Sequence, residues 1–313
     1  MKTKDGRLVF VEHDSKILRD NRLGDPHVRQ FPVWLPPHYD SAPAGRRFPV
    51  LYDLVGYTGS GWSHVNWRNF DENVPEQAAR LLAERKMGPS IIVFPDCFTS
   101  LGGNQYINSS AIGRYADYLT RELTPFIDKE FRTLADRDHR GCFGKSSGGY
   151  AAMIHAMKYP KYWGAVANHS GDAYFDFVYR CGWPAAISTL GSFREPALKP
   201  GVYRRPKRLD GLPPGHDDGR IRRFLEHFHA KKNPTGGEIE TLMMIAMAAS
   251  YDPAPSAPNG FKVPLDLETG EFIAARWKRW LAHDPVFLVR KYRDNLRTLK
   301  GIFMDCGWRD QYW

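Results

Sequence analysis

The segment Gly144-Lys145-Ser146-Ser147-Gly148 places a serine between two glycines in a G-x-S-x-G pattern. An apolar run at 140–143 precedes it, and a predicted helix at 147–159 follows it. Between a strand and a helix, this pattern is typical of a tight turn that exposes a serine hydroxyl for attack on an acyl carbon. A side chain at 144 or 148 would clash with the neighbouring strand and helix, so small residues are required there.

A competing interpretation is a phosphate-binding P-loop, because Gly144-Lys145-Ser146 also matches the end of the pattern G-x-x-x-x-G-K-[ST]. The first glycine of that pattern would fall on residue 139, which is His139. The segment also follows a late strand of the predicted sheet rather than an early one. We therefore favour the nucleophile turn over the phosphate loop.

Seven apolar runs of strand length are spread along the chain, and helical segments separate most of them. They are residues 7–11, 28–35, 49–55, 90–94, 140–143, 165–167 and 301–304. Hydrophobic runs that alternate with helices predict an α/β fold with a mainly parallel sheet, and the first two runs are expected to form its antiparallel edge. Apolar spacing between Tyr115 and Phe131 predicts a crossover helix that Pro125 should kink.

The strand and helix rhythm is lost from 172 to about 283. We expect residues 172–283 to form a mostly helical cap inserted into a core made of 1–171 and 284–313. The cap is expected to set acyl and leaving-group preference, and Met243, Met244 and Met247 either line an acyl pocket or simply pack. Its stretch 191–232 holds eleven Lys or Arg against five Asp or Glu, which indicates a solvated basic face or a surface for anionic substrates.

The composition and charge of the chain exclude several classes of protein. The chain has 313 residues, 44 of them Lys or Arg and 35 Asp or Glu, for a net charge of +9. No apolar run approaches the ~20 residues of a membrane helix, and the N-terminus has no apolar leader. We expect a soluble, cytoplasmic protein that binds neither membrane nor nucleic acid, and self-association stays open. The four cysteines are far apart and form no C-x-x-C pair, so neither a zinc ribbon nor a disulfide scaffold fits.

The ordered set of motifs resembles the "putative esterase" family of the α/β-hydrolase superfamily. That family includes enterochelin-esterase-like, feruloyl-esterase-like and S-formylglutathione-hydrolase-like proteins. The matching stretches are 29–39, 49–61, 91–96, 115–133, the serine turn and 280–310. The resemblance implies hydrolysis of carboxylic esters through an acyl-serine intermediate on Ser146, with neither a metal nor an organic cofactor. Acyl transfer to a sugar or thiol acceptor and a catalytically silent binding protein stay open as alternatives.

The resemblance also implies roles for residues outside the serine turn. The backbone N–H of Tyr57, in the turn Leu54-Val55-Gly56-Tyr57, matches the second oxyanion donor and would act beside the N–H of Ser147. Asp310, in Gly307-Trp308-Arg309-Asp310, matches the catalytic acid, with Asp305 as the runner-up.

Three further residues are expected to line the substrate pocket: His169, Trp62 and Asn104. In the superfamily the order along the chain is serine, acid, histidine, yet all eleven histidines of this chain precede Asp310. We therefore expect the catalytic histidine, a strand and a final helix to lie beyond Trp313. On that expectation these 313 residues alone would hydrolyse esters weakly.

Overall fold

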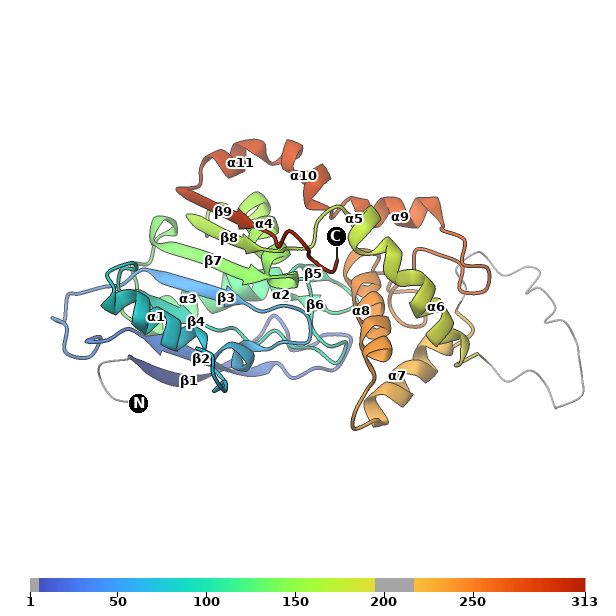
Figure 1. Ribbon diagram of the computed structural model, residues 1–313, viewed down its shortest axis with the longest axis horizontal. Coiled ribbons are helices and arrows are strands. Elements are labelled where there is room, and N and C mark those ends of the chain that lie inside the picture. The colour runs from blue at the N-terminus through green and yellow to red at the C-terminus, as the bar shows by residue number, and fades with distance from the viewer. Residues whose placement is uncertain (1–5, 195–216, 313) are drawn as a thin grey trace, which may run out of the picture.

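The computed structural model describes residues 6–194 and 217–312, so much of the basic stretch 191–232 lies outside the described residues. A seven-stranded sheet with the order β1-β2-β4-β3-β7-β8-β9 forms its centre (Figure 1). The strands are β1 (Arg7–Asp14), β2 (Val28–Leu35), β3 (Val50–Leu54), β4 (Ile91–Val93), β7 (Arg140–Lys145), β8 (Ala165–His169) and β9 (Gly301–Asp305). A separate two-stranded pair comprises β5 (Asn108–Ser109) and β6 (Gly113–Arg114).

The pairing of the strands confirms the predicted mainly parallel α/β sheet. β1 pairs antiparallel with β2, and β2 pairs antiparallel with β4, whereas β4, β3, β7, β8 and β9 run parallel. The parallel strands are mostly buried on both faces in the middle of the sheet, which explains their near-continuous hydrophobic sequences. Because parallel strands share one direction, the residues that follow β3, β7, β8 and β9 meet at the same end of the sheet.

Helices cover both faces of the sheet. The helix α1 (Val74–Ala83) packs with Trp34, Ile92 and Phe94 on one face. On the other face, α4 (Ser147–Lys158) packs against β3, β7 and β8. The predicted crossover helix packs into the same hydrophobic cluster as α4. None of the described helices is long and apolar enough to cross a membrane.

The crossover helix, in which a kink at Pro125 was expected, contains a π-helical segment just before this proline. It consists of α2 (Tyr115–Asp117), a π-helical segment Tyr118–Leu123 and α3 (Thr124–Glu130). Pro125 has no N–H, and its ring would clash with the carbonyl of Arg121 in a regular α-helix. The π-helical turn precedes the proline, and there Thr124 Oγ1 donates to the carbonyl of Leu119 at 2.8 Å. The chain thus continues as one helical segment past the proline.

The described part of 172–283 is mostly helical and lies at the end of the sheet toward which the strands point (Figure 1). Its helices are α5 (Phe175–Val178), α6 (Trp183–Gly191), α7 (Arg220–Ala230), α8 (Gly236–Tyr251) and α9 (Ala274–Leu281). One hydrophobic cluster joins them to the sheet, because it contains Tyr52 of β3 together with Trp183 and Met247. The chain then returns through α10 (Pro285–Lys291) and α11 (Arg293–Arg297) to β9.

Candidate active site

Ser146 occupies the sharp turn between β7 and α4. Its backbone angles are φ 56° and ψ −124°, a region that a residue with a side chain rarely adopts and that carries strain. The N–H of Ser146 donates to the carbonyl of His169 at 3.0 Å, and its own carbonyl accepts from the N–H of Tyr150 at 2.9 Å. These two bonds hold the strained turn between the end of β8 and the first turn of α4.

The two flanking glycines are required by the backbone of β3. A Cβ added to Gly148 would lie 1.7 Å from the carbonyl oxygen of Leu54, and one added to Gly144 would lie 2.1 Å from the same atom. Both distances are far below any real carbon–oxygen contact. The clash predicted from the sequence is therefore confirmed, with β3 as the neighbouring strand.

The turn that carries Tyr57 lies directly against the serine. A Cβ added to Gly56 would approach Cβ of Ser146 to 3.4 Å and the carbonyl oxygen of Lys145 to 3.2 Å. Ser147 is the first residue of α4, and the first N–H groups of a helix have no acceptor within the helix. The structure thus brings the turn that carries Tyr57 beside Ser146, and the role of the N–H groups of Tyr57 and Ser147 as oxyanion donors stays a prediction.

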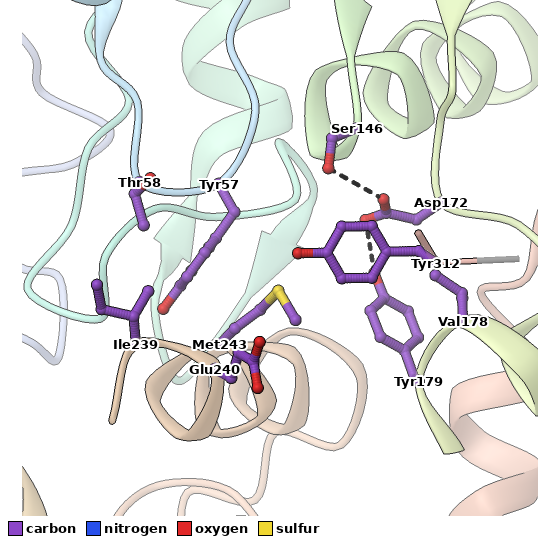
Figure 2. A pocket seen from close by; sticks show the side chains of 10 residues that line it. All are labelled: Tyr57, Thr58, Ser146, Asp172, Val178, Tyr179, Ile239, Glu240, Met243 and Tyr312. Atoms are coloured by element: carbon purple, nitrogen blue, oxygen red, sulfur yellow. Dashed lines mark hydrogen bonds between the residues drawn. The ribbon is translucent and has the colours of Figure 1, made fainter. Parts of the chain in front are cut away.

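A cavity of about 160 Å³ opens beside Ser146 (Figure 2). Ile239, Glu240 and Met243 of α8 form one wall, and no described lysine, arginine or histidine lines it. Met244 and Met247, which the sequence grouped with Met243, are buried in the hydrophobic core instead. The lining residues are Tyr57, Thr58, Ser146, Asp172, Val178, Tyr179, Ile239, Glu240, Met243 and Tyr312.

Asp172 is a site residue that the sequence analysis did not identify. Its Oδ1 accepts a hydrogen bond from Ser146 Oγ at 3.4 Å, and its Oδ2 accepts from Tyr179 Oη at 2.7 Å (Figure 2). Oδ2 also accepts from Gln105 Nε2 at 3.3 Å. Burial raises the pKa of this carboxyl group, and the hydrogen bonds from Tyr179, Gln105 and Ser146 oppose that effect. Its position just after β8, where strand ends converge, was the available sequence signal.

His169 does not line the cavity. Side chains alternate along a strand, and the preceding Asn168 points toward α4, where its Oδ1 accepts from the N–H of Gly171 at 2.8 Å. His169 therefore points to the opposite face of the sheet, where its Nδ1 lies 2.8 Å from Oδ1 of Asp305. The expectation that His169 forms part of the pocket wall is corrected by this alternation.

Trp62 and Asn104 also lie away from the cavity. Trp62 stacks on Phe10 with 5.0 Å between ring centroids, and its Nε1 donates to the carbonyl of Gln30 at 3.2 Å. Asn104 is buried within its own loop, where it donates to the carbonyl of Cys97 and accepts from the N–H of Tyr106. Neither residue lines the two cavities that adjoin Ser146.

The two acid candidates lie on different sides of the sheet end. Asp310 lines a second cavity of about 370 Å³ together with Ser146 and Asp172, and its carboxylate accepts from the N–H of Tyr312 at 2.9 Å. Asp305 pairs with His169 on the other face. Among residues 6–194 and 217–312, no histidine side chain hydrogen-bonds to the side chain of Ser146 or Asp310.

Comparison with known proteins places this site in a family. The model of the family described as "Putative esterase" matches residues 26–312. Esterase Rv1288 of Mycobacterium tuberculosis is 35% identical over 147 residues, which cover 45% of this chain and 28% of that protein. An endo-1,4-beta-xylanase/feruloyl esterase of Xylanibacter ruminicola is 30% identical over 147 residues, which cover 44% of this chain and 19% of that protein. The aligned part is thus less than a third of either relative.

A solved structure shares the fold across nearly the whole chain. It is FphF of Staphylococcus aureus, described as a fluorophosphonate-binding serine hydrolase, with a TM-score of 0.51 and 13% identity over 97% of this chain and 80% of that one. This likeness and the sheet order show the α/β-hydrolase fold. Because the family model covers residues 26–312, the chain belongs to the "Putative esterase" family.

Proposed function

We propose that this chain is a serine carboxylic-ester hydrolase that acts through an acyl-serine intermediate on Ser146. The observation that carries the proposal is the strained serine turn at the mouth of a cavity, with the Gly56 turn packed against it. The relatives named as esterases support the same chemistry. The substrate is a small-molecule ester.

The proposed reaction assigns a role to each group around the serine. Ser146 Oγ attacks the ester carbon, and the N–H groups of Tyr57 and Ser147 stabilise the oxyanion that forms. Asp310 is the proposed acid, whose task is to orient the imidazole that receives the serine proton. Its place beside the cavity that Ser146 also lines supports this choice, whereas Asp305 faces the other side.

The helices of 172–283 are the proposed cap over this site. Val178 and Tyr179 come from the first part of that region, and Ile239, Glu240 and Met243 come from α8, so it supplies about half of the cavity lining. Apolar and aromatic walls with a few polar groups are typical of pockets for small organic substrates. The cap would therefore set the acyl and alcohol preference of the enzyme.

Labelling by a fluorophosphonate tests the proposed function, because such probes react with serines that an active site activates. We expect one adduct per chain, located on Ser146 by peptide mass spectrometry, and no adduct with Ser146→Ala. Ser63→Ala, at a serine outside both cavities, serves as the matched control and should label like the wild type. An adduct that persists in Ser146→Ala, or no adduct on the folded wild-type chain, would refute the proposal.

The position of His169 gives a separate prediction. Because its imidazole pairs with Asp305 on the face away from the cavity, we expect His169→Ala to change the labelling rate of Ser146 by less than about threefold. Asp305→Asn, which removes the partner of His169, should behave in the same way. A loss of labelling in both variants would instead make His169 and Asp305 the base and acid of the reaction.

A further inference from the structure

Asp172 presents a partly buried carboxylate to the hydroxyl of Ser146. Its side chain belongs to a hydrogen-bond network and also lines the cavity that adjoins Ser146. Oδ2 is held by two donors, the hydroxyl of Tyr179 and the amide of Gln105. Tyr179 in turn lies 3.3 Å, Oη to Oη, from Tyr251, so the carboxylate is fixed by buried groups behind it.

Acylation of Ser146 removes the hydrogen-bond donor that Asp172 has in the free protein. When an ester acylates the serine, the Oγ–H bond breaks and a bond forms from Oγ to the acyl carbon. The bond from that carbon to the alcohol oxygen breaks, and the proton leaves with the alcohol. In the acyl-enzyme Oγ is an ester oxygen, which cannot donate, so Oδ1 of Asp172 loses the partner it has at 3.4 Å in the free protein.

A partly buried carboxylate oxygen that loses a donor loses more favourable free energy than a neutral acceptor in the same place would. The acyl group that replaces the proton is the nearest possible source of a new donor, because it is attached to the atom that Oδ1 faces. A hydroxyl on the carbon next to the carbonyl would donate to Oδ1 in place of the serine hydroxyl. In the cavity that α8 lines, a carboxylate there would meet the carboxylates of Asp172 and Glu240, whereas the cationic Lys145 and Arg309 line the second cavity beside Ser146.

We propose that Asp172 selects esters whose acyl group carries a hydroxyl on the carbon adjacent to the carbonyl, that is, 2-hydroxyacyl esters. The inference rests on the proposed function, because it requires acylation of Ser146. It makes Asp172 a specificity-determining residue.

The experiment compares three p-nitrophenyl esters: propanoyl, 2-hydroxypropanoyl and 2-methoxypropanoyl. Intact-protein mass spectrometry measures the rate at which each acylates Ser146, with Ser146→Ala as the blank. We expect the wild type to react about tenfold faster or more with the 2-hydroxy ester than with the 2-methoxy ester, the range of one hydrogen bond to a charged group. The 2-methoxy group keeps the oxygen but cannot donate, so the ratio reports donation to Asp172.

Two variants assign the preference to Asp172. In Asp172→Asn the side-chain amide donates to either oxygen, so the ratio of 2-hydroxy to 2-methoxy rates should fall to within about twofold of one. Glu226→Gln, the control at an exposed carboxylate of α7 outside both cavities, should keep the wild-type ratio. The wild-type ratio is decisive even if Asp172→Asn folds poorly.

These measurements distinguish a failure of the inference about Asp172 from a failure of the proposed function. Equal acylation by all three esters, in a wild type that a fluorophosphonate labels on Ser146, would overturn the inference and leave the proposed function intact. An equal fall of the ratio in Glu226→Gln and Asp172→Asn would also overturn it, because the loss of a negative charge and not the contact with Asp172 would then explain the change. A chain that forms neither an acyl nor a fluorophosphonate adduct would refute the proposed function itself.

Discussion

Gly148→Ala is expected to lower the free energy of unfolding by about 3 kcal/mol and to abolish labelling of Ser146. The added methyl carbon would lie 1.7 Å from the carbonyl oxygen of Leu54 and 2.5 Å from its carbonyl carbon. These are backbone atoms of β3, which is hydrogen-bonded on both sides within the sheet and cannot move without disturbing it. The displaced strand leads directly into the Gly56 turn, so the oxyanion donor at Tyr57 would shift away from Ser146.

Urea unfolding and the fluorophosphonate labelling rate measure the two effects on the same variant. Gly45→Ala is the matched control, because a Cβ at Gly45 meets no atom within 4 Å. We expect it to change the free energy of unfolding by less than about 0.5 kcal/mol and to label normally. Wild-type stability and labelling in Gly148→Ala would contradict the packing of the serine turn on β3.

The sheet and the serine turn could be predicted from the sequence because local signals specify them. Buried parallel strands are read from their hydrophobic runs, and each predicted run lies within a few residues of an observed strand. The two glycines around Ser146 are part of the motif itself, so they could be recognised in the sequence although the atom that requires them, the carbonyl oxygen of Leu54, belongs to β3. Even His169 could have been placed correctly, because alternation along β8 puts it on the face opposite to Asn168.

Other parts of the site depend on contacts between distant segments. Asp172 is a single acidic residue with no spacing signal, and its role arises because Tyr179 and Gln105 approach it from separate segments. Met243 and Met247 have similar sequence surroundings, yet one lines the cavity and the other is buried against Gln105. Which face of α8 meets the cavity is decided by the packing of the whole helix, and a periodic pattern does not reveal it. The proposed cap boundaries at 172 and 283 stay a prediction for the same reason.

The helix that carries the serine turn also contains a buried histidine, which should make the protein sensitive to acid. His155 of α4 has its Nε2 2.9 Å from the carbonyl of Tyr106, and its Nδ1 accepts from Trp163 Nε1 at 3.1 Å. The indole N–H can only donate, so Nδ1 is unprotonated and Nε2 carries the proton. Tyr106 Oη in turn donates to the carbonyl of Val55 at 2.7 Å, which connects His155 to the turn that carries Tyr57.

Burial lowers the pKa of His155 to about 4, the bond to the Tyr106 carbonyl partly opposes this, and Lys158 adds to it. The unfolded chain titrates near the ordinary histidine value of about 6.5, so between these two values the unfolded state binds more protons than the folded state. Stability is therefore full above about pH 6.5 and falls as the pH drops toward 4. The difference corresponds to about 3 kcal/mol. His283, whose pKa burial also lowers to about 4, acts in the same direction.

Urea unfolding of the wild type and His155→Gln at about pH 7 and about pH 4.5 tests this. The variant keeps one donor and one acceptor but does not titrate, so it should be the less stable protein at neutral pH. Its disadvantage should shrink by about 2–3 kcal/mol at the lower pH, because only the wild type loses the stability linked to His155. His229→Gln, at an exposed histidine of α7, controls for the loss of a histidine as such. A disadvantage of His155→Gln that is the same at both pH values would show that His155 takes up its proton equally in the folded and unfolded chain, which would contradict the lowered pKa of the buried imidazole.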